Sequence, residues 1–407
     1  MNGRQGPASA SMAATSTMSS MPDELLRYRP EFPILERTTY LISNSLGAMP
    51  LGVEDALHHY TEMWSTRGVC AWEDEWWMLA SQVGDEIGAL MNAPQGSVAC
   101  LVNVTTCQAT VASCLEFSGR RNKVVYSDLN FPSVMYFWEA QRSRGARVEM
   151  VRNDDGIHVN TERLLDAIDA ETVIVPISHV IFRSAFIQEV EAIVEKAHRV
   201  GAYVLLDSFQ ALGTLPFDVQ ELNVDFCTGG VLKWLCGGPG TAYLYVRPDL
   251  AKKLEPSFTG WFGHENPFGF ETGATRYTPT IYRFTQGTSN IPALQVARPG
   301  VKIIAEVGVD KIREKSKRQT ALLIEKADQH GWRVNTPRDP DRRGGTVSID
   351  MPNAEQVCSE LLKRDVLVDY RPKAGVRFSP HFYNSDEELT KAMETVEDIL
   401  SEMKVGA

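Results

Sequence analysis

The chain has 407 residues, and its 52 Asp and Glu outnumber its 41 Lys and Arg, so the formal net charge is −11. Hydrophobic residues make up 43% and charged residues 23%, as in ordinary globular proteins, and the length allows two or three domains. An acidic surface is unsuited to nucleic acids and anionic membranes. The sequence also lacks a run of about 18 apolar residues, the length that a membrane-spanning helix needs. We therefore expect neither nucleic acid nor membrane as a partner.

Cysteine usage and the N-terminal residues bear on location and metal binding. The seven cysteines are odd in number and include no Cys-x-x-Cys pair, which argues against a disulfide framework or a zinc site. We expect reduced thiols, no metal and a cytoplasmic protein. Residues 1–21 are mostly Ser, Ala, Thr and Gly and lack the apolar stretch of a secretion signal, so we predict a disordered tail.

Residues 22–60 open the ordered part of the chain. We expect them to form an N-terminal segment that packs on a small C-terminal domain, before the helical, tryptophan-rich stretch that follows crosses to a large domain at 61–295. Within this segment, Asn44 and Ser45 are candidate substrate-binding residues.

From residue 98 the chain alternates short apolar runs with amphipathic stretches. A helical stripe between 187 and 200 is followed by Gly201, a C-terminal stop signal. Several of the runs lack polar alternation, as strands buried on both faces do. The pattern predicts an α/β domain with a mainly parallel sheet. The predicted strands are 98–102, 123–126, 147–151, 172–177, 203–206 and 241–246.

The pattern changes after residue 295, and residues 296–407 predict a smaller α+β domain. A long charged helix is expected over 301–330, then strands near 344–350, 365–369 and 375–379. Ser385 and Glu388 form a capping box, which predicts a final helix from residue 385.

Asp207 and Lys233 are the residues most suggestive of chemistry. Asp207 ends an apolar strand, and ligands of open α/β sheets bind where strands end. Lys233 follows 26 residues later, between apolar side chains and glycines, a setting that lowers an amine's pKa and makes it nucleophilic. Pyridoxal phosphate requires a lysine for its Schiff base and an acidic partner for its ring nitrogen, so this pair predicts that cofactor.

A phosphate site is predicted where the strand at 98–102 leads into Asn103-Val-Thr105-Thr106. These residues should open a helix, and the amides of a helix N-terminus together with two hydroxyls suit a dianion.

Together with several longer motifs, these residues resemble a known family. The chain resembles fold-type I pyridoxal phosphate enzymes of aminotransferase class V, and kynureninases in particular, from about residue 40 onward. The likeness rests on Phe131-Pro-Ser133, His179-Val-Ile-Phe-Arg-Ser184, Leu232-Lys-Trp-Leu-Cys-Gly-Gly-Pro-Gly240, Gly260-Trp-Phe-Gly-His-Glu265, Gly287-Thr288 and Arg377-Phe-Ser-Pro-His-Phe-Tyr-Asn384. It implies a three-layer large domain, a pyridoxal 5'-phosphate cofactor, an α-amino acid substrate and a homodimer with shared active sites.

The resemblance also implies a role for individual residues. Lys233 carries the Schiff base and moves protons, and Arg377 binds the substrate α-carboxylate. The implied cofactor contacts are Asp207 with the ring nitrogen, Gln210 with the ring 3-oxygen, Phe131 stacked on the ring with Ser133 nearby, Thr105, Thr106 and Trp261 with the phosphate, and Thr288 with the phosphate from the second subunit.

Three positions depart from the kynureninase pattern, and they affect the predicted reaction. This chain has Leu232 where kynureninases have a tyrosine, Val134 where they have an aspartate, and Gln210 where they have a histidine. A leucine cannot donate a proton, so hydrolytic cleavage of a carbon–carbon bond loses an acid.

The sequence leaves several reactions open. Kynureninase-like side-chain cleavage, by hydrolysis or by β- or γ-elimination, is the first hypothesis, and transamination is the second. Epimerisation and cysteine desulfurase-like chemistry follow, although neither Cys236 nor Cys358 has the context of a mobile catalytic cysteine. A non-catalytic binding protein of the same fold is disfavoured by the intact Lys233 and Asp207.

Overall fold

A computed structural model describes residues 23–405, so the predicted tail at 1–21 lies outside the described residues. The larger of the sheets has seven strands in the order β2-β8-β7-β6-β5-β3-β4. All are parallel except β8, which runs antiparallel to both of its neighbours. The strands are β2 (Val98–Leu101), β3 (Lys123–Ser127), β4 (Arg147–Val151), β5 (Thr172–Ser178), β6 (Tyr203–Asp207), β7 (Phe226–Gly230) and β8 (Ala242–Val246).

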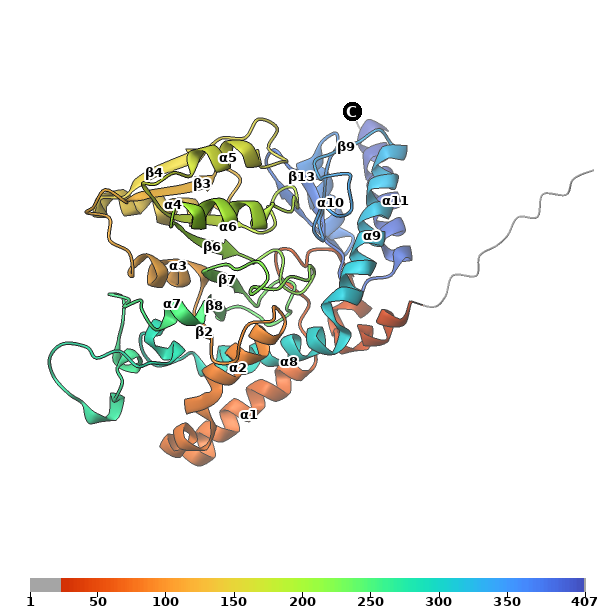
Figure 1. Cartoon of the computed structure of the whole chain (residues 1–407). Helices are drawn as coiled ribbons and strands as arrows, with labels where there is room; N and C mark the ends of the chain where they lie inside the picture. The colour runs from red at the N-terminus through yellow and green to blue at the C-terminus, as the bar shows by residue number, and fades with distance from the viewer. Residues whose placement is uncertain (1–22, 406–407) are drawn as a thin grey trace, which may run out of the picture.

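Helices cover both faces of this sheet and give it three layers (Figure 1). Alternate strand residues point to opposite faces, and each set joins a different apolar core. One face packs on α3 (Val104–Ala112) and α4 (Pro132–Ala140). The other packs on α2 (Trp77–Ala89), α5 (Thr161–Ala167), α6 (Val190–Arg199) and α8 (Ile291–Val307). The prediction of an α/β fold with a mainly parallel sheet is confirmed.

A second, antiparallel sheet of four strands lies near the C-terminus, in the order β12-β13-β10-β9. Its apolar core includes residues of three helices that pack on it, and α9 and α11 lie side by side (Figure 1). The strands are β9 (Arg333–Val334), β10 (Val347–Asp350), β12 (Asp369–Arg371) and β13 (Gly375–Phe378), and the helices are α9 (Val309–Gln329), α10 (Ala354–Lys363) and α11 (Asp386–Val405). The predicted capping box is present, because Ser385 and Glu388 exchange hydrogen bonds at the start of α11.

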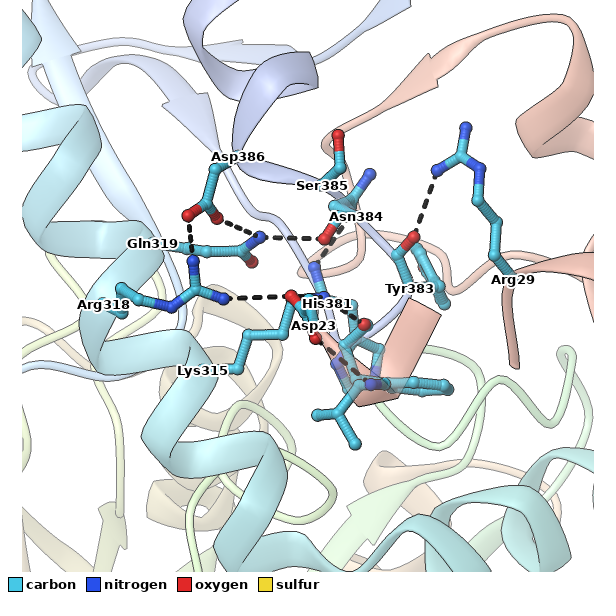
Figure 2. Close-up of polar contacts among 12 residues, drawn as sticks. Asp23, Arg29, Lys315, Arg318, Gln319, His381, Tyr383, Asn384, Ser385 and Asp386 are labelled. Carbon is cyan, nitrogen blue, oxygen red and sulfur yellow. Dashed lines mark hydrogen bonds and ion pairs between the residues drawn. The ribbon is translucent and has the colours of Figure 1, made fainter. Parts of the chain in front are cut away.

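The N-terminal segment is anchored to this second sheet and its helices. Strand β1 (Thr39–Tyr40) pairs in parallel with β11 (Val366–Leu367). Asp23 lies between Lys315 and Arg318 of α9 (Figure 2). Its carboxylate is 2.8 Å from the Lys315 amine and 3.0 Å from the Arg318 guanidinium, and Arg318 also pairs with Asp386. The chain then crosses to the large sheet through α1 (Gly52–Arg67), which packs on α8.

Short helices complete the described chain. They are η1 (Glu24–Glu31), η2 (Pro33–Glu36), η3 (Gly68–Cys70), η4 (Trp72–Trp76), η5 (Gln141–Arg144), α7 (Pro248–Ala251), η6 (Trp261–Gly263), η7 (Pro267–Gly269) and η8 (Ile281–Phe284). Within residues 23–405 no helix is both long and apolar enough to cross a membrane. All seven cysteines are free.

The structure differs from the sequence predictions at three elements. The expected helix over 301–330 is wrong as a single element, because Gly308, with φ +87°, separates α8 from α9. Strand β7 was not predicted. The helix expected from residue 187 begins at Val190, because Ile187 forms a β-bridge with Val180.

Candidate active site

A cavity of about 210 Å³ lies where the parallel strands of the large sheet end. Its walls come from the segments that follow β2, β3, β5, β6 and β7, since the carboxyl ends of parallel strands meet at one edge. Six of the predicted site residues line it together: Thr105, Phe131, Ser133, Asp207, Gln210 and Lys233. The other lining residues are Asn103, Val104, Gln108, Val134, Ser178, Val180, Phe182 and Phe209.

Asp207 places a buried carboxylate in this cavity without a compensating charge in contact. The residue is 6% exposed, and its Oδ1 accepts one hydrogen bond, from the backbone N–H of Phe209 at 3.0 Å. No basic side chain among residues 23–405 forms an ion pair with it. Burial raises the pKa of Asp207 to about 6, against the lowering effect of that hydrogen bond and of Lys233. Such a carboxylate is stabilised by a bound cation.

Lys233 extends its amine into the same cavity between two aromatic rings. Its Nζ lies 4.2 Å from the ring centre of Phe209 and 5.6 Å from that of Phe131. Burial lowers the pKa of Lys233 to about 8, although the negative charge of Asp207 acts in the opposite direction. An amine with this pKa is partly neutral near physiological pH and can act as a nucleophile and a base.

The backbone around Lys233 is fixed by the N-terminal segment. The N–H of Gly47 donates to the carbonyl of Leu232 at 2.8 Å. A Cβ at Gly47 would lie 2.1 Å from the carbonyl oxygen of Lys233, so only glycine allows this approach.

Gln210 connects the cavity to the N-terminal segment. Its Nε2 donates to the carbonyl of Asn44 at 3.0 Å, and its Oε1 accepts from the indole N–H of Trp234 at 3.0 Å. The side-chain amide of Asn44 is buried and has no hydrogen-bond partner within residues 23–405. Ser45 beside it is half-buried. The two candidate substrate residues therefore lie next to the cavity, although neither lines it.

The helix N-terminus predicted as a phosphate site is present at α3. Asn103 caps the helix by accepting from the N–H of Thr106 at 2.9 Å. Thr105 lines the main cavity, whereas Thr106 lines a second hollow of about 310 Å³ together with Thr288. Within one chain, the two threonines of the predicted phosphate site therefore face different spaces.

Arg377 and Trp261 do not line the cavity of this chain. The Nε and Nη2 of Arg377 bind the carboxylate of Asp369 at 2.7 and 2.5 Å, and its Nη1 donates to the carbonyl of Phe182, a cavity residue. Trp261 is 41% exposed. Its ring packs in an aromatic cluster with Trp77, Phe262, Phe268 and Phe270.

Sequence reasoning missed several lining residues. Ser178 directly follows the last predicted position of β5, and Phe209 lies two residues after Asp207, so their position after a strand was a usable signal. Gln108 gave a weaker signal, since it is a polar residue three positions after Thr105 on a helix that is otherwise buried there. Phe182 reaches the cavity from a loop; it lies within the motif His179–Ser184 on which the family resemblance rests, but the resemblance implied no role for it.

The departures from the kynureninase pattern leave few ionisable groups at the site. Val134 lines the cavity and is buried, and Leu232 stands beside Lys233 with no hydroxyl to offer. Asp207 and Lys233 are the only acidic or basic side chains among the lining residues.

These residues fit pyridoxal phosphate. The unpaired, buried Asp207 suits a protonated ring nitrogen, Lys233 suits a Schiff base, and the N-terminus of α3 suits a phosphate. A sequence model of the family described as aminotransferase class-V matches residues 39–391. The chain belongs to the aminotransferase class V family. It is a pyridoxal phosphate-dependent enzyme.

Individual relatives agree with the family but carry different activities in their names. An uncharacterized aminotransferase of Bacillus subtilis (strain 168) is 31% identical over 383 residues, which cover 93% of this chain and 98% of that protein. A kynureninase of Pseudomonas fluorescens is 29% identical over 395 residues, which cover 93% of each chain. The apo structure of a cysteine desulfurase from Thermococcus onnurineus NA1 superposes with a TM-score of 0.81 at 21% identity, covering 92% of this chain and 98% of that one. At that identity the likeness shows the fold alone.

Proposed function

We propose that this class V enzyme cleaves the side chain of an α-amino acid by elimination, with Lys233 as the base. The observation that carries this proposal is that Lys233 is the only basic side chain lining the cavity. Hydrolysis of a carbon–carbon bond needs a further acid or base to activate water and protonate the leaving carbon, and the cavity offers only Asp207. A side-chain group that leaves as a stable anion needs no such acid.

The cofactor, when bound, supplies an electron sink that labilises bonds at the substrate α-carbon. We propose that Asp207 holds the ring nitrogen in its protonated form and that Phe131 stacks on the ring with Ser133 beside it. Thr105 and the first-turn amides of α3 bind the phosphate, and Gln210 hydrogen-bonds the ring 3-oxygen. Lys233, whose pKa is held near 8, removes the proton at the α-carbon.

Substrate binding is proposed for the side of the cavity nearest the second sheet. Arg377 reaches the cavity wall through the carbonyl of Phe182 and is the candidate for the α-carboxylate, with Asn44 and Ser45 beside it. Because Asp369 already occupies two of its donors, Arg377 would offer its remaining N–H groups or exchange partners.

Transamination is the second candidate, and the same observation favours it over hydrolysis. A single lysine can remove the α-proton and return it to another carbon, so no further acid is required. The Bacillus subtilis relative named as an aminotransferase is consistent with this reaction. A desulfurase-like reaction has less support, because Cys236 and Cys358 are buried and burial raises the pKa of Cys236 to about 12.

The decisive experiment measures where the amino nitrogen of the substrate goes. The purified protein with pyridoxal phosphate is incubated with a panel of amino acids, including kynurenine, with and without a keto-acid acceptor. Elimination is expected to release ammonia and a keto acid without any acceptor. Nitrogen that appears only in the acceptor would identify an aminotransferase, and anthranilate released from kynurenine would show that hydrolysis proceeds despite Leu232. Either result, transfer of nitrogen to the acceptor or release of anthranilate, would overturn the proposal of elimination.

We also propose the wider organisation. Residues 61–295 would form the large cofactor-binding domain and 296–407 the small domain, with α8 spanning the boundary and 22–60 packing on the small domain. A homodimer would bring Thr288 of one chain to the phosphate site of the other, as the resemblance implies. We propose the same for Trp261, because it does not line the cavity of its own chain. Their exposure, together with Phe268 and Phe270 at 60% and 74%, supports this arrangement. The seven free cysteines support a cytoplasmic location.

A further inference from the structure

Gln108 is a buried side chain of the cavity wall whose hydrogen bonding is incomplete. It lies on α3, is 1% exposed and lines the same cavity as Asp207 and Lys233. Within residues 23–405 nothing accepts a hydrogen bond from its Nε2. Among the residues that line the cavity, only Gln108 has a side-chain N or O that is closed off from solvent and still lacks a partner. A buried donor without an acceptor is destabilising, so its retention calls for an explanation such as a ligand that supplies the acceptor.

Trp138 fixes which end of the Gln108 amide is left unpaired. The Nε1 of Trp138 lies 2.6 Å from the Oε1 of Gln108, and both residues are buried. An indole N–H can only donate, so the amide oxygen must face Trp138 and a flipped amide would place two donors together. The nitrogen is therefore the end that is left without a partner.

The position of Gln108 on α3 relates it to the cofactor. It lies three residues after Thr105, so the two side chains share one face of the helix, and both line the cavity. The N-terminus of this helix is the expected phosphate site. The candidate substrate residues Asn44, Ser45 and Arg377, in contrast, come from the N-terminal segment and the second sheet.

We propose that Gln108 is a positioning residue for pyridoxal phosphate. Its Nε2 donates a hydrogen bond to an acceptor atom of the bound cofactor, and Trp138 holds the amide in the donating orientation. This role concerns the cofactor and is independent of which reaction the enzyme catalyses.

The test measures cofactor binding by the full-length chain. Wild type and Gln108→Met are freed of cofactor and titrated with pyridoxal phosphate, and the dissociation constant is read from absorbance. Methionine has a similar length but no donor. We expect the dissociation constant to rise roughly 2- to 12-fold, the change that corresponds to one neutral hydrogen bond. The stabilisation that the cofactor gives against urea should shrink accordingly.

Gln141 provides a matched control. It is also a buried glutamine, 8% exposed, but its Nε2 donates to the carbonyl of Phe137 and its Oε1 accepts from Arg144. Gln141→Met and Gln108→Met each lose hydrogen bonds within the chain, so both should lower the urea midpoint of the apoprotein. Only Gln108→Met should weaken cofactor binding.

Trp138→Phe tests the orienting contact. On that background the Gln108→Met change should raise the dissociation constant by a smaller factor than it does with Trp138 present, because the amide is no longer held. An unchanged dissociation constant in Gln108→Met would overturn the proposal, as would equal weakening by Gln141→Met. A raised KM for the amino acid with unchanged cofactor binding would assign the donor to the substrate instead, and would also overturn it.

Discussion

Buried charged side chains at the two ends of the strands of the seven-stranded sheet differ in whether they have ion-pair partners. At the amino ends of the strands, Lys123 is 2% exposed and its Nζ contacts Glu149, Asp169 and the carbonyl of Ala167. Asp225 at the same edge is 1% exposed and is bound by His198, Arg247 and the N–H of Val204. At the carboxyl ends, Asp207 and Lys233 have no ion-pair partner within residues 23–405.

This difference separates structural charges from functional ones. A buried charge whose partners are all in the chain is neutralised in the folded protein and has nothing further to bind. A buried charge without such partners raises the free energy of the empty protein and is stabilised when a complementary ligand arrives. The shifted pKa values of Asp207 and Lys233 are the electrostatic signature of the second case.

The largest expected difference is in turnover, between variants of Lys233 and of Lys123. Lys233→Ala should lower turnover by about 10²- to 10⁴-fold or more, because it removes the base of the site, and should abolish the absorbance of the covalently held cofactor. Lys123→Met should leave turnover of the folded enzyme unchanged. It should instead lower the free energy of unfolding by about 1–3 kcal/mol through lost hydrogen bonds. Turnover, absorbance spectra and urea unfolding check both variants, and substantial turnover by Lys233→Ala would remove the basis of the comparison.

Asp207 should make the stability of the apoprotein depend on pH. Burial raises the pKa of Asp207 from 3.8 to about 6 in the folded chain, so the folded state binds this proton more tightly than the unfolded state. Its contribution to stability is complete below about pH 4 and is lost as pH rises through about 6, a loss of about 3 kcal/mol. Urea unfolding of the apoprotein between pH 4 and pH 7 should show this loss in wild type and not in Asp207→Asn.

Asp207 and Asp225 should differ in their effect on cofactor binding. Asp207→Asn should weaken pyridoxal phosphate binding about 10- to 150-fold, the value of a hydrogen bond to a charged group. Asp225→Asn should leave cofactor binding intact and lower stability by about 1–3 kcal/mol, because His198 and Arg247 lose their common partner. The comparison would be reversed if Asp225→Asn released the cofactor and Asp207→Asn did not.

The smallest expected effect concerns Arg377, which has features of both classes. It is fully paired with Asp369, as the structural charges are, yet it also binds a cavity residue. Arg377→Ala should raise KM for the amino acid roughly 10-fold while leaving the cofactor bound. Asp369→Asn, which frees the guanidinium, should not raise KM. Loss of cofactor from Arg377→Ala would show that our role for this residue is wrong.

The sequence predictions were accurate where an element had a signal in its own residues and failed where the element depends on pairing or on a change in backbone direction. Strands such as 172–177 and 203–206 were found because mainly apolar runs bounded by turns are typical of buried parallel strands. Strand β7, Phe226–Gly230, includes two glycines and has no apolar run, and its identity comes from pairing with β6 and β8. The helix expected over 301–330 failed because its apolar period continues across Gly308, where the backbone turns.

The predictions of site residues also depended on whether the signal was local in the sequence. Asp207, Lys233 and the start of α3 were found because their chemistry is local, a charge at a strand end or donors at a helix start. The unpaired nitrogen of Gln108 could not be predicted, since it results from Trp138, 30 residues away in the chain. The partners of Arg377 were hidden for the same reason, because Phe182 lies 195 residues away.

The sequence by itself determined the α/β class, the positions of most strands along the chain and the identity of the two central charged residues, because apolar periodicity and strand-end polarity are properties of neighbouring residues. Only the tertiary structure decided which buried charges find partners. Lys123 and Lys233 are both lysines that adjoin apolar residues in the sequence, Val124 in one case and Leu232 and Trp234 in the other. The packing of distant segments gives one of them three hydrogen-bond partners and leaves the amine of the other facing a cavity with no ion-pair partner in the described chain.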